Sequence, residues 1–135
     1  MRLRRAYAEF LARQRVAHVA TSTPTGAPHV VPVCLAVDGG RLYFASGKTG
    51  RKIRDLRANA QIAVSADDYT ELWDGLRGVV VSGTARIHAR NATFRRIRRR
   101  LYQKYPQYRT EATLGDGDSV VVEIVPRRVL AWGFD

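Results

Sequence analysis

The chain has 135 residues, the size of one domain, and 45% of them are hydrophobic, so one packed core is expected. Its 23 Lys and Arg against 12 Asp and Glu give a formal net charge of +11, which favours a nucleic acid, a membrane surface or an anionic small molecule as partner. The single cysteine excludes an internal disulfide and a cysteine-based zinc cage, and no apolar run approaches the ~20 residues needed to span a bilayer. The N-terminus also lacks the apolar core of a secretory signal, so we expect one domain over residues 1–135, located in the cytoplasm.

The first part of the chain predicts a helix followed by three strands. Apolar residues at helical spacing predict an amphipathic helix over residues 2–15. Strands are predicted at Val16–Thr21, His29–Val37 and Arg41–Ala45, with turns at 23–28 and 38–40. Because proline cannot donate to a ladder, the strand that contains Pro32 should lie at a sheet edge or be bulged there.

The rest of the chain predicts two more helices and three more strands. The helices are expected at Gly50–Asn59 and Ala92–Tyr105, and the strands at Gln61–Ala66, Gly78–Ile87 and Ser119–Val125. Gly83 indicates a bulge or a close contact inside its strand. Strands joined mainly by hairpins, with short helices between some of them, favour a mainly β (α+β) fold: an antiparallel barrel of six or more strands with short flanking helices.

The segment Leu42–Ala60 carries the strongest functional signal. It predicts a strand that runs into the start of a helix, and polar or cationic side chains gather at the junction: Ser46, Lys48, Thr49, Arg51 and Lys52. The first N–H groups of a helix have no partners inside the helix, and the helix dipole favours an anion there. Lysine, arginine and hydroxyl groups add charge and donors, so the segment predicts a site for a phosphate-bearing cofactor. It lacks the spacing of a Walker A motif.

The basic segments, the histidines and the cysteine also allow other interpretations of the sequence, each with weaker support. The same basic segment could be a solvated surface without a ligand, and the arginines of residues 95–100 could be a solvated helix face. His18, His29 and His88 are scattered and give no metal-binding spacing, so no metal site is expected. Cys34 lies in an apolar strand and is expected to be a small core residue. A nucleic-acid-binding module is the least supported alternative, because no groove-reading motif or aromatic platform accompanies the arginines.

Several motifs occur together in a recognisable order. They are Gly26-Ala27-Pro28, Val31-Pro32-Val33, Leu42-Tyr43-Phe44-Ala45-Ser46, Gly50-Arg51-Lys52, Val81-Ser82-Gly83-Thr84-Ala85, Pro126-Arg127-Arg128-Val129 and Trp132-Gly133. In this order the sequence resembles the pyridoxamine 5'-phosphate oxidase-like family of flavin and deazaflavin proteins, whose fold is a split β-barrel. The resemblance covers almost the whole chain.

The resemblance implies a homodimer with a cofactor site at each side of the subunit interface. It implies that Arg51 and Lys52 hold the cofactor phosphate, and that Ala45 and Ser46 line its approach. It places the strand that contains Val31, Pro32 and Val33 along the ring system, and it places Trp132 near the cofactor across the dimer interface. Lys48 and Thr49 are expected to assist at the phosphate.

Two departures from the family separate this chain from vitamin B6 oxidases. Gly78 stands where those enzymes have a glutamine that contacts the flavin, and the Trp-Gly pair is not followed by an Arg-x-His segment. The short, arginine-rich form most resembles the actinobacterial branch that uses the deazaflavin F420, which carries a phosphate and a polyglutamate tail. The resemblance therefore implies an F420(H2)-dependent oxidoreductase that transfers a hydride to a small organic substrate. The alternatives are an FMN-dependent oxidoreductase of the same fold and a cofactor-binding protein without turnover.

Overall fold

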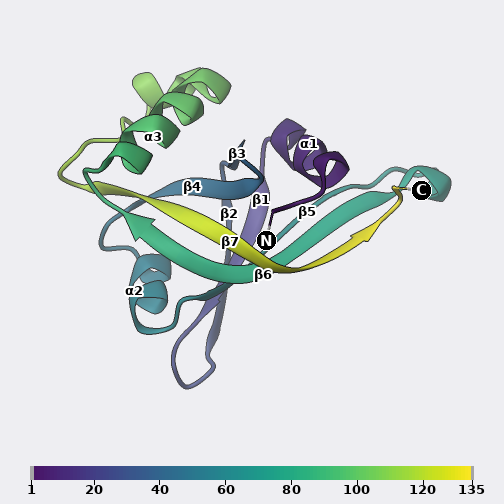
Figure 1. Cartoon of the computed structure of the whole chain (residues 1–135), viewed down its shortest axis with the longest axis horizontal. Helices are drawn as coiled ribbons and strands as arrows, with labels where there is room; N and C mark the ends of the chain where they lie inside the picture. The colour runs from purple at the N-terminus through teal and green to yellow at the C-terminus, as the bar shows by residue number, and fades with distance from the viewer. Residues whose placement is uncertain (1, 135) are drawn as a thin grey trace.

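One curved antiparallel sheet organises the protein. A computed structural model describes residues 2–134, and within them seven strands form a sheet in the order β2-β1-β5-β6-β7-β4-β3. Figure 1 shows the long β6 and β7 curving across the molecule, with α3 near one end of the pair and the C-terminus at the other. The predicted mainly β architecture with short flanking helices is confirmed.

The helices and strands follow the predicted order. The strands are β1 (Ala17–Ser22), β2 (Pro28–Val33), β3 (Ala36–Asp38), β4 (Arg41–Gly47), β5 (Gln61–Asp68), β6 (Arg77–His88) and β7 (Ser119–Trp132). The α-helices are α1 (Arg5–Arg13), α2 (Arg51–Ala58) and α3 (Ala92–Lys104), and short 3-10 helices cover Trp73–Gly75 and Pro106–Arg109.

Two predicted strands differ from the observed ones. The strand expected over His29–Val37 is interrupted, because the Leu35 backbone bonds to a side chain. The Leu35 N–H donates to the Tyr105 hydroxyl at 3.1 Å, and the hydroxyl oxygen also lies 3.1 Å from the Leu35 carbonyl oxygen. The last strand continues past Val125 to Trp132, since a register shift at Gly83 lets β7 stay paired with β6. That shift is the irregularity predicted for Gly83.

Two features of the sheet agree with the residues that predicted them. β2 lies at an edge of the sheet, as Pro32 predicted. Gly39 and Gly40 both have positive φ, 59° and 75°, which suits the two-residue hairpin between β3 and β4.

Apolar side chains form two clusters on the covered sides of the sheet. The larger cluster joins α1, α2 and the strands around Phe10, Leu11, Phe44 and Ile53. The smaller one packs α3 against β3, β4 and β7. Among residues 2–134, no helix is long and apolar enough to cross a membrane.

A buried ionic cluster lies at the junction of β4, β6 and β7. Glu123, only 4% exposed, accepts hydrogen bonds from Arg41 at 2.5 Å and from His88 at 2.7 Å. Burial alone would raise the pKa of Glu123, but these two partners outweigh it and lower the pKa. Burial, and then the nearby Glu123 carboxylate, raise the pKa of Tyr43.

Candidate cofactor site

The start of α2 is held beside the sheet by polar contacts. Asp55 is buried and accepts a hydrogen bond from the Thr21 hydroxyl of β1 at 2.8 Å. At the end of the helix, the Asn59 amide donates to the Ser22 hydroxyl at 3.1 Å. These bonds fix the position of the first turn, which contains no acidic residue and has no side-chain cap at Gly50. The first turn therefore presents positive charge and helix N–H groups without a competing carboxylate cap.

A groove of about 320 Å³ runs between β2, β4 and the first turn of α2. Four residues predicted for the cofactor site line it: Pro32, Val33, Ala45 and Lys52. Val16, Cys34 and Tyr108 complete the lining. The groove thus combines one cationic side chain with walls that are otherwise mostly apolar or aromatic, a combination that small-molecule sites share.

The backbone of β2 offers free polar groups at the sheet edge. β2 pairs with β1 alone, and Pro28 and Pro32 occupy alternate positions of that register. Because proline has no N–H, these are the positions where the two strands exchange no hydrogen bonds, so backbone groups there point away from β1. The Pro28 carbonyl agrees with this assignment, since it accepts a 3.4 Å hydrogen bond from Arg51. By the same alternation, the N–H and C=O of Val30 and the C=O of Pro32 face the free edge.

The remaining residues of the phosphate prediction surround the turn between β4 and α2. Lys48, Thr49 and Arg51 are exposed, while Ser46 is buried and donates to the Gly47 carbonyl at 3.0 Å. The Arg51 guanidinium also lies 3.8 Å from Asp55, so its position is partly fixed by its own helix. Cationic and hydroxyl side chains therefore gather at the turn that leads to Lys52, as an anionic group would require, although these four residues do not line the groove itself.

Two further predicted site residues, Val31 and Trp132, also do not line this groove within one chain. Val31 packs against the large apolar cluster and so faces inward. Trp132 lies at the other end of the sheet, where it pairs with Gly78. Its indole occupies the space above that glycine: a Cβ at Gly78 would lie 2.0 Å from the ring. Gly78 therefore allows the tryptophan to lie flat across the sheet.

The sequence did not identify three residues that line the groove. Cys34, expected in the core, is only half-buried and borders the groove. Val16 and Tyr108 come from segments that sequence patterns place far from the junction of β4 and α2. The Tyr105–Tyr108 pair beside the final turn of α3 was the available signal, because two tyrosines so spaced around a proline can wall a pocket.

The arginine-rich helix α3 is engaged in internal contacts. Arg96 and Arg100 pair with Asp38 at 2.9 and 3.0 Å, and Arg98 pairs with Asp116 at 2.6 Å. These pairs tie α3 to the β3–β4 hairpin and to the loop before β7. In residues 2–134, no group of three or more His, Cys, Asp or Glu side chains is arranged to hold a metal ion.

The architecture is that of a split β-barrel domain, with a groove between an edge strand and a helix start. The chain belongs to the pyridoxamine 5'-phosphate oxidase family, whose model matches residues 3–133. A search of curated protein sequences gave no match.

Solved structures of the same fold are similar over nearly the whole chain. A conserved hypothetical protein from Mycobacterium tuberculosis is 24% identical with a TM-score of 0.79, covering 96% of this chain and 84% of its own. An F420 reductase is 26% identical with a TM-score of 0.75, and the match covers 95% of this chain and 98% of that one. A FAD-binding protein from Mesorhizobium loti is 24% identical with a TM-score of 0.77, over 96% and 94% of the two chains.

Proposed function

We propose that this protein is a cytoplasmic F420(H2)-dependent oxidoreductase that transfers a hydride between a bound deazaflavin and a small organic substrate. One observation carries the proposal: Lys52, in the first turn of α2, lines the same groove as Pro32 and Val33 of the edge strand. An anion site and a free row of backbone donors and acceptors thus border one cavity, as a phosphate-bearing ring cofactor requires. The likeness to an F420 reductase supports the choice of deazaflavin.

Each part of the groove would have a distinct task. Lys52 and Arg51 would hold the phosphate, with Lys48, Thr49 and the buried Ser46 beside it. The free backbone groups of β2 would orient the polar edge of the ring. Apolar walls such as Val33 and Ala45 would exclude water from the ring face. When bound, the reduced deazaflavin supplies the hydride, so the chain needs no nucleophile or metal of its own.

FMN is the second candidate, because its phosphate could bind at the start of α2 and its ring could lie along the free edge of β2, as proposed for F420. F420 carries more negative charge than FMN, and the net charge of +11 favours the more anionic ligand. Separate equilibrium titrations with F420 and FMN test the proposal, and we expect the tighter binding for F420.

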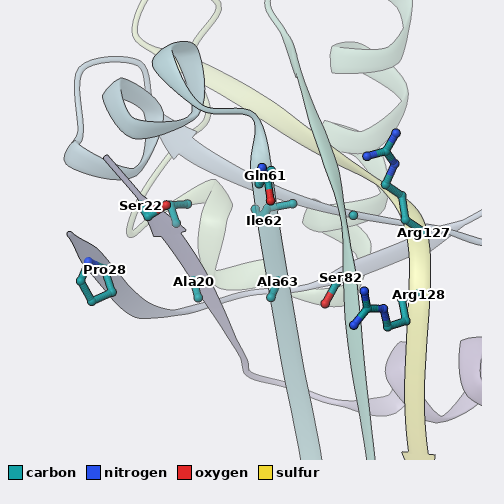
Figure 2. A pocket seen from close by; sticks show the side chains of 11 residues that line it. Ala20, Ser22, Pro28, Gln61, Ile62, Ala63, Ser82, Arg127 and Arg128 are labelled. Carbon is teal, nitrogen blue, oxygen red and sulfur yellow. The ribbon is translucent and has the colours of Figure 1, made fainter. Parts of the chain in front are cut away.

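The proposal includes a homodimer, because one face of the sheet is uncovered and has small side chains along its middle, which would let a second chain pack closely. Ala20, Ala63 and Ser82 lie side by side across β1, β5 and β6, with Arg128 at one end of the row (Figure 2). Val30 of β2 pairs with Ala20 and lies at the other end. These small side chains border a hollow of about 610 Å³. Val30 is 64% exposed and Leu130 on the same face is 63% exposed. A flat face with exposed apolar groups suits a second copy of the chain.

Two-fold symmetry could also bring Trp132 of one subunit to the start of α2 in its partner. Trp132 and Gly78 lie at one end of the uncovered face, and Pro28 and Ser22, next to α2, lie at the other. The two ends are about six residues apart along the strands, or roughly 20 Å at ~3.3 Å per residue. An axis in the plane of this face and perpendicular to the strands would exchange the two ends. Trp132 of one subunit would then lie near Pro28 and the start of α2 in its partner.

Ala63→Arg should convert the dimer into monomers without unfolding the chain. In the isolated subunit the new side chain can reach solvent, whereas in the dimer it would bury a charge at the centre of the interface. Analytical ultracentrifugation should give twice the 15.1 kDa chain mass for the unmodified protein and a single chain mass for the variant. Ala12→Arg, on the exposed side of α1, is the control and should remain dimeric. A monomeric unmodified protein would contradict this interface.

A further inference from the structure

A second hollow opens beside the cofactor groove. It measures about 330 Å³ and lies between the segment before β1 and the segment that follows α3. Val16, Cys34 and Tyr108 line both the hollow and the groove, so the two cavities are neighbours that share a wall. A ligand of one or two fused rings would fit this volume, which lies at the small end of the range for ligand pockets.

The walls of the hollow are apolar and fixed. Its surface consists almost entirely of apolar atoms. Tyr105 is 5% exposed, and its hydroxyl donates to the Arg15 carbonyl at 2.8 Å and bonds to the Leu35 backbone. The Tyr108 ring meets the Tyr105 ring edge to face, with 6.0 Å between their centroids. Because these contacts exist without a ligand, the pocket is preformed.

Two charged residues line the hollow, Arg15 and Glu111, and Glu111 is exposed to solvent. The Arg15 guanidinium is stacked over the Tyr105 ring at 4.4 Å and donates to the Lys104 carbonyl at 2.8 Å, so its donors are partly engaged. Burial, together with the neighbouring Cys34, raises the pKa of Tyr108, which keeps its hydroxyl neutral at physiological pH. An ionised ligand would lose its hydration against walls whose surface is almost entirely apolar, and an anionic one would find no free cation among the described residues that line it, whereas a neutral ligand has no such cost.

We propose that this hollow binds the hydride acceptor, and that the acceptor is a neutral, conjugated, largely apolar molecule. The inference rests on the proposed function and adds the substrate class. The apolar body of the acceptor would fill the hollow, and its electron-poor carbon would lie past Tyr108, at the shared wall. The acceptor would gain a hydride, with its two electrons, from the reduced deazaflavin and one proton from water, and the ring proton that the oxidised deazaflavin loses would return to water.

Binding of Prodan, a neutral naphthyl ketone whose emission shifts to shorter wavelength in apolar surroundings, tests this assignment without turnover. The unmodified protein should bind Prodan with a blue shift, and Ala112→Phe, which fills the hollow without lining the groove, should weaken binding at least tenfold. Ala12→Phe is the matched control, because Ala12 lines a different hollow. Both variants should bind F420 as the unmodified protein does.

The possible results separate this inference from the proposed function. If Prodan fails to bind, or if both variants weaken it equally, the hollow is not the acceptor site, whatever the F420 titration gives. If Prodan binds and only Ala112→Phe weakens it, while F420 does not bind, the hollow is an apolar ligand site but its role as the acceptor site of a deazaflavin enzyme is refuted. Selective loss of Prodan with unchanged F420 affinity supports both assignments.

Discussion

Replacing Lys52 with alanine should weaken F420 binding by about 10- to 100-fold. A charge-assisted hydrogen bond to phosphate contributes roughly 1.5–3 kcal/mol, and 1.4 kcal/mol corresponds to a tenfold change in Kd. Lys52 is the cationic side chain that lines the groove together with Pro32 and Val33 of β2, so its loss removes the positive charge from the groove wall. Fluorescence titration of the variant with F420 measures the effect. Its thermal unfolding temperature should change little, because within residues 2–134 Lys52 takes part in no ion pair.

Arg57→Ala provides the matched control for this prediction. Arg57 is an exposed cation in the last turn of the same helix, so its removal changes the net charge by the same amount at the opposite helix end. We expect less than a threefold change in F420 affinity for this variant. Equal losses in the two variants would show that general attraction, rather than a phosphate contact at Lys52, determines binding.

Glu123→Gln should give the largest loss of stability, about 3 kcal/mol or roughly 10 °C in Tm. The change leaves Arg41 and His88 without their shared carboxylate in a site where Glu123 is 4% exposed. Because the Arg41 side chain is 34% exposed and can reach water, we place the cost at the low end for a broken buried pair. Glu9→Gln is the control: it removes an exposed i,i+4 partner of Arg5 and should cost less than about 0.5 kcal/mol.

The stability gap between the unmodified protein and Glu123→Gln should depend on pH. The folded-state pKa of Glu123 is lowered, so the carboxylate stabilises the fold above its unfolded-state pKa of about 4.3. That contribution is lost as the pH falls through the folded-state pKa. Urea unfolding should therefore show the full gap near pH 7 and a smaller gap at about pH 3.5. A gap of the same size at both pH values would mean that packing, not charge, causes the destabilisation.

Local patterns predicted the elements well, because each has its own periodicity and turn residues. Pro32 predicted an edge strand and Gly83 an irregularity, and both follow from the bonding that one residue can make. The break at Leu35 was missed because its cause, the Tyr105 hydroxyl, lies 70 residues away in the sequence. Propensity within a nine-residue window contains no information about such a partner.

In the candidate site, too, features that depend on neighbouring residues were predictable, and features that depend on residues far away in the sequence were not. Lys48 and the first-turn residues Arg51 and Lys52 predict an anion site at the start of α2, because a helix start and its charges are local features, and this site stays a prediction. Tyr108 and Val16 reach the groove only through the packing of α3 and β1, which no local pattern encodes. The position of Trp132 within the proposed site depends on a second chain, so neither its spacing nor its burial in one subunit could reveal it.

The most direct test of the central claim is a pair of titrations, with F420 and with FMN, that follow tryptophan fluorescence of the purified protein at moderate salt. The account predicts F420 binding at micromolar Kd or tighter, and FMN binding at least tenfold weaker. Tighter binding of FMN would contradict the deazaflavin assignment, and binding of neither ligand would contradict a cofactor site in the groove between β2 and α2.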